Sequence, residues 1–248
     1  MTDFVVLPNL PINASHVIIG EDYAGILSPK LKELGINVIS IPPNRSVAKN
    51  ISCHADISLM HFGGNRIIAS QGTDRGFLTH LAEFGFEISV CRELQGSCYP
   101  EDTQVNAVYL NGNLICNPQT VSCSVMEHFK YAPLIKVRQG YTKCNTCIVD
   151  SKSVITSDPG IAAILTNKGF DVLKIKPGSI ELPGYDYGFI GGCAFKLSAD
   201  RLAFTGRLDA HPDKQAIEAF AKKRGVDIVF LTDRPAFDIG SALPVIEN

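Results

Sequence analysis

Four short segments of the chain follow one pattern, and this repeat constrains the fold more than any other feature of the sequence. Each has a glycine, an apolar residue, a polar Asn, Asp or Glu, and then a β-rich run: GINVISI (35–41), GFEISVC (85–91), GFDVLKI (169–175) and GVDIVFL (225–231). A stretch of helical composition precedes each one, so the glycine is predicted to be the C-cap of a helix that leads into a strand. A fifth copy, VSCSVMEHFKYAPLIKVR (121–138), keeps the helix and the strand but lacks the glycine.

The segments ahead of these helices repeat as well. Four of them predict two strands joined by a tight turn: DISLMHFGGNRIIAS (56–70), NAVYLNGNLICN (106–117), NTCIVDSKSVITS (145–157) and CAFKLSADRLAFTG (193–206). The first unit has only HVIIG (16–20), and the C-terminal SALPVIEN (241–248) is predicted to supply its missing strand. Such a strand closes the chain into a ring and removes the open sheet edges.

The chain is thus predicted to be an α/β protein built from five strand–turn–strand–helix–strand units. The units are expected at about residues 14–45, 54–95, 104–139, 143–177 and 186–233, with a closing strand at 238–248. With 248 residues, of which 45% are hydrophobic, the chain can bury the core of one such domain.

Charge and composition argue against several classes of function. The net charge of −2 gives no electrostatic footprint for nucleic acid or an anionic membrane. No apolar run reaches the roughly 20 residues of a membrane span, and the N-terminal MTDFVVLPNLPIN lacks the basic and long apolar regions of a signal peptide. Eight cysteines without such a peptide are expected to be reduced thiols in a cytoplasmic protein. The sequence leaves a homo-oligomer open.

Two cysteines three residues apart, in KCNTC (143–147), raise the question of a metal or redox site. Cys144 and Cys147 are predicted to begin the first strand of unit four, where residues three apart point to opposite faces. A zinc site would also need a second ligand pair, and none has the required spacing. We therefore expect no metal and no cofactor; a structural role is favoured over a redox pair.

Five ββαβ units in a ring resemble the pentein fold, the α/β propeller of the guanidine-modifying enzymes. The resemblance covers residues 14–248, and NTCIVDSKSVITSDPG followed by GGCAFKLSADRLAFTGR is similar to consecutive units of the hydrolase branch. That superfamily includes arginine deiminase, agmatine deiminase, glycine amidinotransferase and dimethylarginine dimethylaminohydrolase. It also includes a non-catalytic relative, the ribosome anti-association factor of archaea and eukaryotes.

The resemblance implies a site at one mouth of the ring, where the first strands converge. In the enzymes a cysteine thiolate attacks the guanidinium carbon, a histidine, often in a His-x-Asp motif, moves protons, and carboxylates hold the cation. The thiolate has to be generated by a neighbouring base or cation. The carboxylates offset the charge of the substrate through bidentate hydrogen bonds.

Two motifs supply candidates for the catalytic groups. CHADISLM (53–60) contains His54 and Asp56, which i, i+2 spacing would put on one face of a strand as proton shuttle and substrate anchor. In FIGGCAFKL (189–197), Cys193 follows two glycines that would let a ligand approach the backbone, so it is the preferred nucleophile, although a buried apolar thiol is the common alternative.

Three further residues are assigned to substrate binding. Asn106 and Asn145 begin the corresponding segments of units three and four, and Asp238 lies just before the closing strand. The tail itself departs from the resemblance, because DIGSALPVIEN has Ser241 and Ala242 where the enzymes have their cysteine. Serine would need its own base and oxyanion site, so this departure weakens the hydrolase interpretation.

Three hypotheses remain open at this stage. The first is an active or degenerate enzyme acting on a small cationic guanidino or amidino compound, with Cys193, or else Cys147 or Cys53, as its nucleophile. The second is a non-catalytic ring that binds a small molecule or a protein. The third is a cation pocket without turnover, built from Asp56, Asp186 and Asp238. A thiol within about 4 Å of His54 would favour the first, because nucleophile and base must be near hydrogen-bond reach.

The Gly- and Tyr-rich segment PGYDYG (183–188) could close such a mouth as a lid or serve only as a connection.

Overall fold

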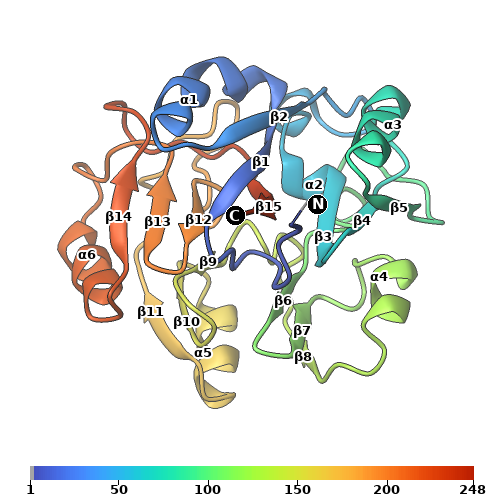
Figure 1. Ribbon diagram of the computed structural model, residues 1–248. Helices are drawn as coiled ribbons and strands as arrows, with labels where there is room; N and C mark the ends of the chain where they lie inside the picture. Colours follow the sequence, from blue (N-terminus) through green and yellow to red (C-terminus); the bar gives the residue numbers. More distant parts are fainter. Residues whose placement is uncertain (1–2) are drawn as a thin grey trace.

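The computed structural model describes residues 3–248. Its strands form five three-stranded sheets that stand around a common centre, with the longer helices at the periphery (Figure 1). In strand order the sheets are β15-β1-β2, β3-β4-β5, β6-β7-β8, β9-β10-β11 and β12-β13-β14. The predicted five-unit α/β ring is therefore confirmed.

Units two to five share one topology, in which the first two strands are antiparallel and the third is parallel to the second, after a helix. Unit two has β3 (Leu59–Gly63), β4 (Arg66–Ala69), α3 (Arg75–Glu83) and β5 (Glu87–Val90); unit three has β6 (Val108–Leu110), β7 (Asn113–Cys116), α4 (Cys123–His128) and β8 (Leu134–Lys136). Unit four has β9 (Cys147–Ile148), β10 (Ser153–Thr156), α5 (Pro159–Asn167) and β11 (Asp171–Lys174); unit five has β12 (Ala194–Ser198), β13 (Arg201–Phe204), α6 (Lys214–Lys222) and β14 (Asp227–Phe230).

Unit one is completed by the end of the chain. It contains β1 (Ala14–Gly20), α1 (Glu21–Glu33) and β2 (Asn37–Ile41), and β15 (Leu243–Glu247) pairs antiparallel with β1. The register places Val17 opposite Pro244 and Ile18 opposite Leu243. The C-terminal strand thus supplies the strand that the first unit lacks, as the sequence predicts.

Local backbone chemistry explains why the pattern repeats. The glycines that follow four helices, Gly35, Gly85, Gly169 and Gly225, have φ values of 78°, 97°, 83° and 66°. This left-handed conformation ends a helix at little cost only for a residue without a Cβ, and the strand starts directly afterwards.

Five hydrophobic clusters hold the units together, and each lies between two neighbouring units. The cluster that joins the last unit to the first packs Val17 and Leu27 of unit one against Leu197 and Ala203 of unit five. Because this contact is built like the other four, the ring is closed by core packing as well as by strand pairing.

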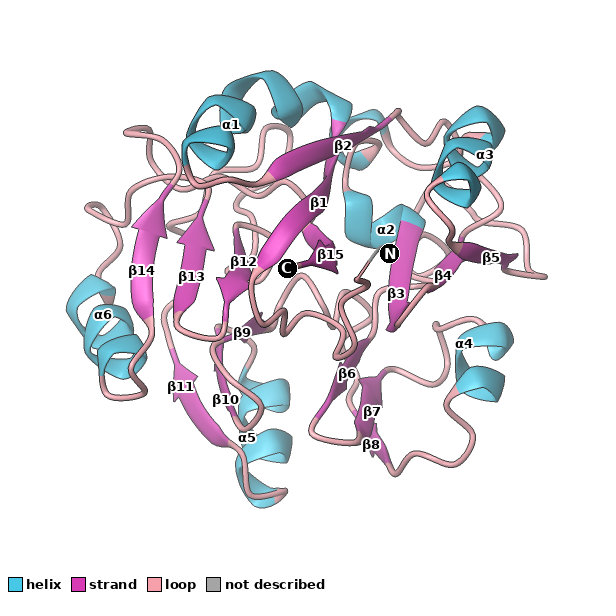
Figure 2. Ribbon diagram, viewed as in Figure 1, coloured by secondary structure: helices cyan, strands magenta, loops and turns pink. Residues whose placement is uncertain are grey.

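The innermost strands, seen in Figure 2, are the first strand of each unit, and irregular segments lead into them from one mouth of the ring. A short 3₁₀ helix, η1 (Lys49–Ile51), and a one-turn helix, α2 (Ala55–Ser58), belong to the segment that enters β3. The opposite mouth is crossed by the N-terminal segment, where Val5 N donates to Val245 O at 3.1 Å. Within the described residues, no helix combines the length and apolarity needed to cross a membrane.

Candidate functional site at the ring mouth

A cavity of about 80 Å³ opens at the mouth where the irregular segments meet. It is lined by one carboxylate, one imidazole, one thiol, four aromatic rings and three aliphatic side chains: Asp238, His54, Cys144, Tyr141, Tyr185, Tyr187, Phe189, Ile51, Ile57 and Leu182. An open groove of about 690 Å³ lies beside it, and Asp238 lines both. The mouth cavity and the groove therefore meet at this carboxylate.

Asp238 is held rigidly in the loop between β14 and β15. Its Oδ2 accepts a hydrogen bond from Phe189 N at 2.8 Å and its Oδ1 accepts one from Gly240 N at 2.9 Å, and the side chain is almost fully buried. A Cβ on Gly192 would overlap this carboxylate, so a glycine at position 192 is what lets Asp238 occupy its position. Asp238, which the sequence analysis assigns to substrate binding, thus lies at the ring mouth.

His54 lies next to Asp238, with 3.8 Å between its Nδ1 and Asp238 Oδ1. Burial lowers the pKa of the imidazole, and the Asp238 carboxylate only partly opposes that effect. Its Nε2 has no hydrogen-bond partner among the described residues. A buried ring nitrogen without a partner costs free energy, which makes this atom a candidate contact for a ligand.

The strand predicted to carry His54 and Asp56 is not there. His54 precedes the one-turn helix α2, Asp56 lies inside it, and β3 begins only at Leu59. Residues two apart share a face in a strand but not in a helix, so the start of α2 at Ala55 turns Asp56 away from His54. His54 lines the mouth cavity, while Asp56 lines a small cavity of about 10 Å³ on the far side of the ring centre.

Asp56 forms the ring centre together with Cys144 and Asn106. The Cys144 thiol donates to Asp56 Oδ2 at 2.9 Å, and Asn106 Nδ2 donates to Cys144 Sγ at 3.2 Å. Asn106 Oδ1 accepts from the backbone of Lys143 at 2.7 Å, so this predicted substrate ligand instead fixes the turn that carries Cys144. Burial raises the pKa of the Asp56 carboxyl to about 7, with Lys143 opposing the shift.

Lys143 and Ser241 complete the centre, and no motif in the sequence singles out the lysine. Lys143 Nζ donates to Ser241 Oγ at 2.9 Å, and both side chains are buried. Ser241 has a φ of 60°, a conformation uncommon for a residue with a Cβ. Ser241 therefore occupies the position of the expected cysteine as a hydrogen-bonded residue of the ring interior.

None of the three thiols predicted as nucleophiles, Cys193, Cys147 and Cys53, lines the mouth cavity. Cys193 packs in the hydrophobic cluster between units four and five, its Sγ donates to Ile190 O at 3.3 Å, and burial raises its pKa well above the ordinary value. Burial likewise raises the pKa of Cys147 to about 12 and raises that of Cys53. No hydrogen bond joins His54 to any thiol within residues 3–248.

The interpretation of KCNTC as one strand is partly wrong. Only Cys147 belongs to β9, while Cys144 lies in the turn before it. Cys144 contacts Asp56, and Cys147 packs in the hydrophobic cluster between units four and five. Burial, then the carboxylates of Asp56 and Asp238, raise the pKa of Cys144 well above its ordinary value. Among residues 3–248, no group of three or more His, Cys, Asp or Glu side chains could hold a metal ion.

Two further candidates lie away from the cavity. Asn145 is buried, and its Nδ2 donates to Tyr141 O at 3.1 Å within the turn, so it stabilises the backbone. Asp186 is exposed and lines neither the mouth cavity nor the groove. Its two neighbours in PGYDYG, Tyr185 and Tyr187, do line the cavity, so this segment forms one of its walls.

The aromatic wall was not identified from the sequence as a set. Phe189 has its ring centroid 6.0 Å from that of Tyr141 and 6.2 Å from that of Tyr187, with the latter pair nearly perpendicular. The Tyr141 hydroxyl donates to Asp102 Oδ2 at 2.6 Å, which fixes that ring. The excess of tyrosine in PGYDYG was the available signal, but only the fold brings Tyr141 and Phe189 to it.

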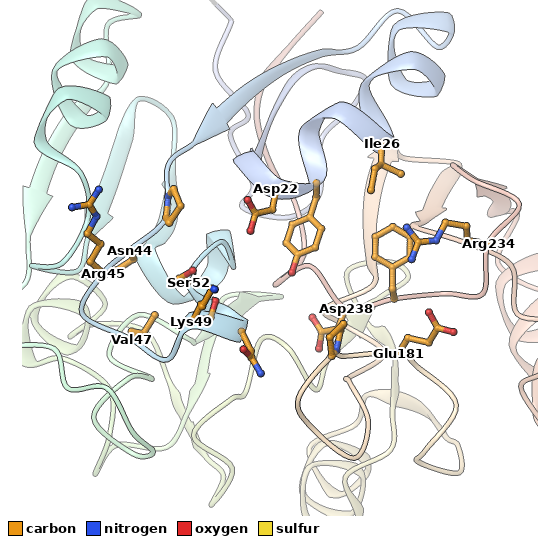
Figure 3. A pocket seen from close by; sticks show the side chains of 15 residues that line it. Asp22, Ile26, Asn44, Arg45, Val47, Lys49, Ser52, Glu181, Arg234 and Asp238 are labelled. Atoms are coloured by element: carbon orange, nitrogen blue, oxygen red, sulfur yellow. Dashed lines mark hydrogen bonds between the residues drawn. The ribbon is translucent and has the colours of Figure 1, made fainter.

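The groove carries charges of both signs (Figure 3). Asp22 extends from α1 on one side and Asp238 lies on the other, with Arg234 and Glu181 toward one end and Arg45 toward the opposite end. Chemically, the cavity and the groove offer a buried carboxylate, a neutral imidazole and aromatic faces, which suit a small organic cation. The thiol in the cavity is a hydrogen-bond donor to Asp56 rather than an activated nucleophile.

Comparison with solved structures shows the same fold in guanidine-modifying enzymes. An inosamine-phosphate amidinotransferase from Streptomyces griseus superposes with a TM-score of 0.67 at 10% identity, covering 100% of this chain and 98% of that chain. SxtG, an amidinotransferase from Microseira wollei, gives 0.60 at 10% identity with 100% and 97% covered. Agmatine deiminase from C. jejuni with substrate bound gives 0.60 at 10% identity with 99% and 96% covered.

At these identities the likeness establishes the fold, and the pentein resemblance predicted from the repeats is confirmed. A comparison with curated proteins finds no sequence match. One family does match, over residues 18–243, which is nearly the whole ring. The chain belongs to this family, described as a family of unknown function (DUF6873).

Proposed function

We propose that the ring mouth binds a small organic cation, with guanidino and amidino compounds as the first class to test, and that it does so without a thiolate nucleophile. The observation that carries the proposal is the state of Asp238. This carboxylate is almost fully buried, and its one ion-pair neighbour among residues 3–248 is His54, whose lowered pKa leaves it neutral at neutral pH. A buried carboxylate without a cation is costly, and a cationic ligand removes that cost.

The surroundings of Asp238 support the same proposal. The partnerless His54 Nε2 lines the same cavity and can accept one N–H from a ligand. The fold neighbours include enzymes named for agmatine and for amidino transfer, so the scaffold is one on which guanidino compounds are handled. The raised thiol pKa values favour binding over covalent chemistry, because a protonated thiol is a poor nucleophile.

Calorimetric titration with agmatine tests the proposal. We expect saturable binding by the wild type and by Asp186→Asn, which removes an exposed carboxylate outside the cavity, and no binding by Asp238→Asn. Because Asp238 also orders two backbone amides, thermal melting must establish that the Asp238→Asn variant is folded. A change in the His54 ring ¹⁵N shifts of the wild type on titration gives the same answer without a mutation. Absence of both heat and shift with agmatine, with other guanidino compounds and with alkylated ammonium ions such as tetramethylammonium would sink the proposal.

A second candidate is a guanidino hydrolase with Cys144 as nucleophile, favoured by one observation: Cys144 and His54 line the same cavity. Iodoacetamide labelling with mass-spectrometric site identification separates the two candidates. Binding without turnover predicts labelling of the exposed Cys98 and Cys123 only. Rapid labelling of Cys144 that agmatine blocks, together with release of ammonia from agmatine, would instead establish the hydrolase.

A further inference from the structure

The mouth cavity contains more aromatic surface than hydrogen-bond acceptors. Four of its ten lining residues are aromatic and three are aliphatic, and Asp238 is its one carboxylate. Both Asp238 oxygens already accept a backbone N–H, from Phe189 and Gly240. The Tyr141 hydroxyl donates its proton to Asp102. The carboxylate and imidazole acceptors left for a ligand are the remaining lone pairs of Asp238 and His54 Nε2, and the tyrosine hydroxyl oxygens add only neutral acceptors.

This balance has a consequence for the head group of the ligand. An unsubstituted guanidinium carries several N–H donors, and each one buried without an acceptor loses free energy. An alkylated ammonium carries the same charge with one N–H or none, and its methyl groups pack against apolar walls. Aromatic faces attract such a cation through their quadrupoles when it lies within about 6 Å of the ring centroid.

The geometry of the wall suits an alkylated cation. Phe189 and Tyr187 stand at 85° to each other with centroids 6.2 Å apart, so they present two sides of a corner. Tyr141 continues the wall, 6.0 Å from Phe189. The cavity of about 80 Å³ is small beside the groove, so it suits one compact head group rather than a whole extended ligand. A longer tail would leave past Asp238 into the groove of about 690 Å³.

We propose that the preferred ligand of the mouth cavity carries a tertiary or quaternary ammonium head, held between the Asp238 carboxylate and the rings of Tyr141, Tyr187 and Phe189. This inference rests on the proposed function, cation binding at the mouth, and specifies its ligand class. A tertiary ammonium would donate its single N–H to His54 Nε2. A quaternary ammonium would be held by charge and ring faces alone.

Calorimetric titration of the full chain with tetramethylammonium, choline and agmatine, as chloride salts at matched ionic strength, tests the inference. We expect tetramethylammonium and choline to bind more tightly than agmatine. Tyr187→Leu, which removes the ring at a partly exposed position, should weaken tetramethylammonium about tenfold. Tyr131→Leu, at an exposed tyrosine outside the cavity, is the control and should leave that affinity unchanged, and Tyr187→Phe, which keeps the ring, should retain most of it.

The outcomes distinguish this inference from the proposed function. Agmatine binding that depends on Asp238 and equals or exceeds that of the ammonium salts overturns the ammonium head while the cation site stands. An unchanged affinity for tetramethylammonium in Tyr187→Leu also overturns the inference, because the ring would then contribute nothing. No binding of any cation overturns both.

Discussion

Replacing Asp56 by asparagine should change how the stability of the protein depends on pH. In the folded chain the pKa of Asp56 is about 7, against an ordinary value of 3.8, because the carboxyl is buried. The difference is about 3 units, which at about 1.4 kcal/mol per unit amounts to about 4 kcal/mol. The Cys144 thiol donates to this carboxyl, and an asparagine oxygen can accept the same hydrogen bond.

The sign of this pH dependence follows from whether the folded or the unfolded chain releases the Asp56 proton at the lower pH. Below about pH 4 Asp56 is protonated in both the folded and the unfolded chain, and its burial carries no ionisation penalty. Between about pH 4 and pH 7 the unfolded chain ionises while the folded chain does not, so the free energy of unfolding of the wild type falls as pH rises. The asparagine side chain does not titrate. The stability of Asp56→Asn relative to the wild type should therefore rise by about 4 kcal/mol from pH 4 to pH 8.

Urea unfolding followed by far-UV circular dichroism at a series of pH values measures this difference, since the chain has no tryptophan. Buried histidines such as His54 and His61, whose pKa values burial lowers, contribute a slope of the opposite sign, but it is common to both proteins and cancels in the difference. Asp186→Asn, at an exposed position, is the matched control and should run parallel to the wild type. Parallel curves for Asp56→Asn as well would refute the reasoning, because the carboxyl would then ionise in the folded chain as it does in water.

Two further predictions concern the carboxylate at the mouth and an exposed thiol. Gly192→Ala should destabilise the protein by about 1–3 kcal/mol and weaken cation binding, because the added Cβ would displace Asp238. The control is Gly25→Ala in helix α1, where a Cβ meets nothing within 4 Å. That substitution should stabilise the protein by about 0.5–1 kcal/mol. Thermal melts and agmatine titration of both variants check this, and equal effects at the two glycines would contradict it. Glu93→Gln should speed alkylation of Cys123 at mildly alkaline pH, because the nearby Glu93 carboxylate, which accepts a hydrogen bond from Cys123 N, is the main cause of the raised pKa of that thiol. An unchanged labelling rate would show that Glu93 does not control the thiol.

The ring could be predicted because its signals are local and occur several times. A glycine with positive φ ends a helix and starts a strand in four units, and Asn111-Gly112, with φ values of 49° and 77°, makes the hairpin that the dipeptide indicates. The incomplete first unit and the extra C-terminal strand could be matched because the first unit lacks one strand and the last strand has no unit of its own. These inferences needed no knowledge of side-chain packing.

The site could be predicted only as a set of residue types. Asp56 lies at the ring centre, and His54 and Asp238 line the mouth cavity. Their orientation depends on the irregular segments ahead of the strands, which have no periodicity from which it could be predicted. The two glycines before Cys193 predict room for a ligand. They are needed instead because a Cβ on Gly191 would overlap the backbone of Thr146 and one on Gly192 would overlap Asp238. Close packing within the protein and close approach of a ligand both require a glycine, so the sequence alone does not distinguish them.

The distribution of charge across the centre decides which carboxylate is available to a ligand. Asp56 has Lys143 among its charged neighbours and a pKa of about 7, so near neutral pH much of it is uncharged and the rest is offset within the protein. Asp238 forms no ion pair with a lysine or arginine within residues 3–248; its ion-pair neighbour there is the buried His54, which is neutral under the same conditions. On the side covered by the N-terminal segment, the charge of Asp56 is thus offset within the protein. On the side of the mouth cavity, no lysine or arginine among residues 3–248 forms an ion pair that offsets the charge of Asp238. A ligand that supplies one positive charge and few N–H donors at that cavity neutralises Asp238 without leaving new polar groups unpaired.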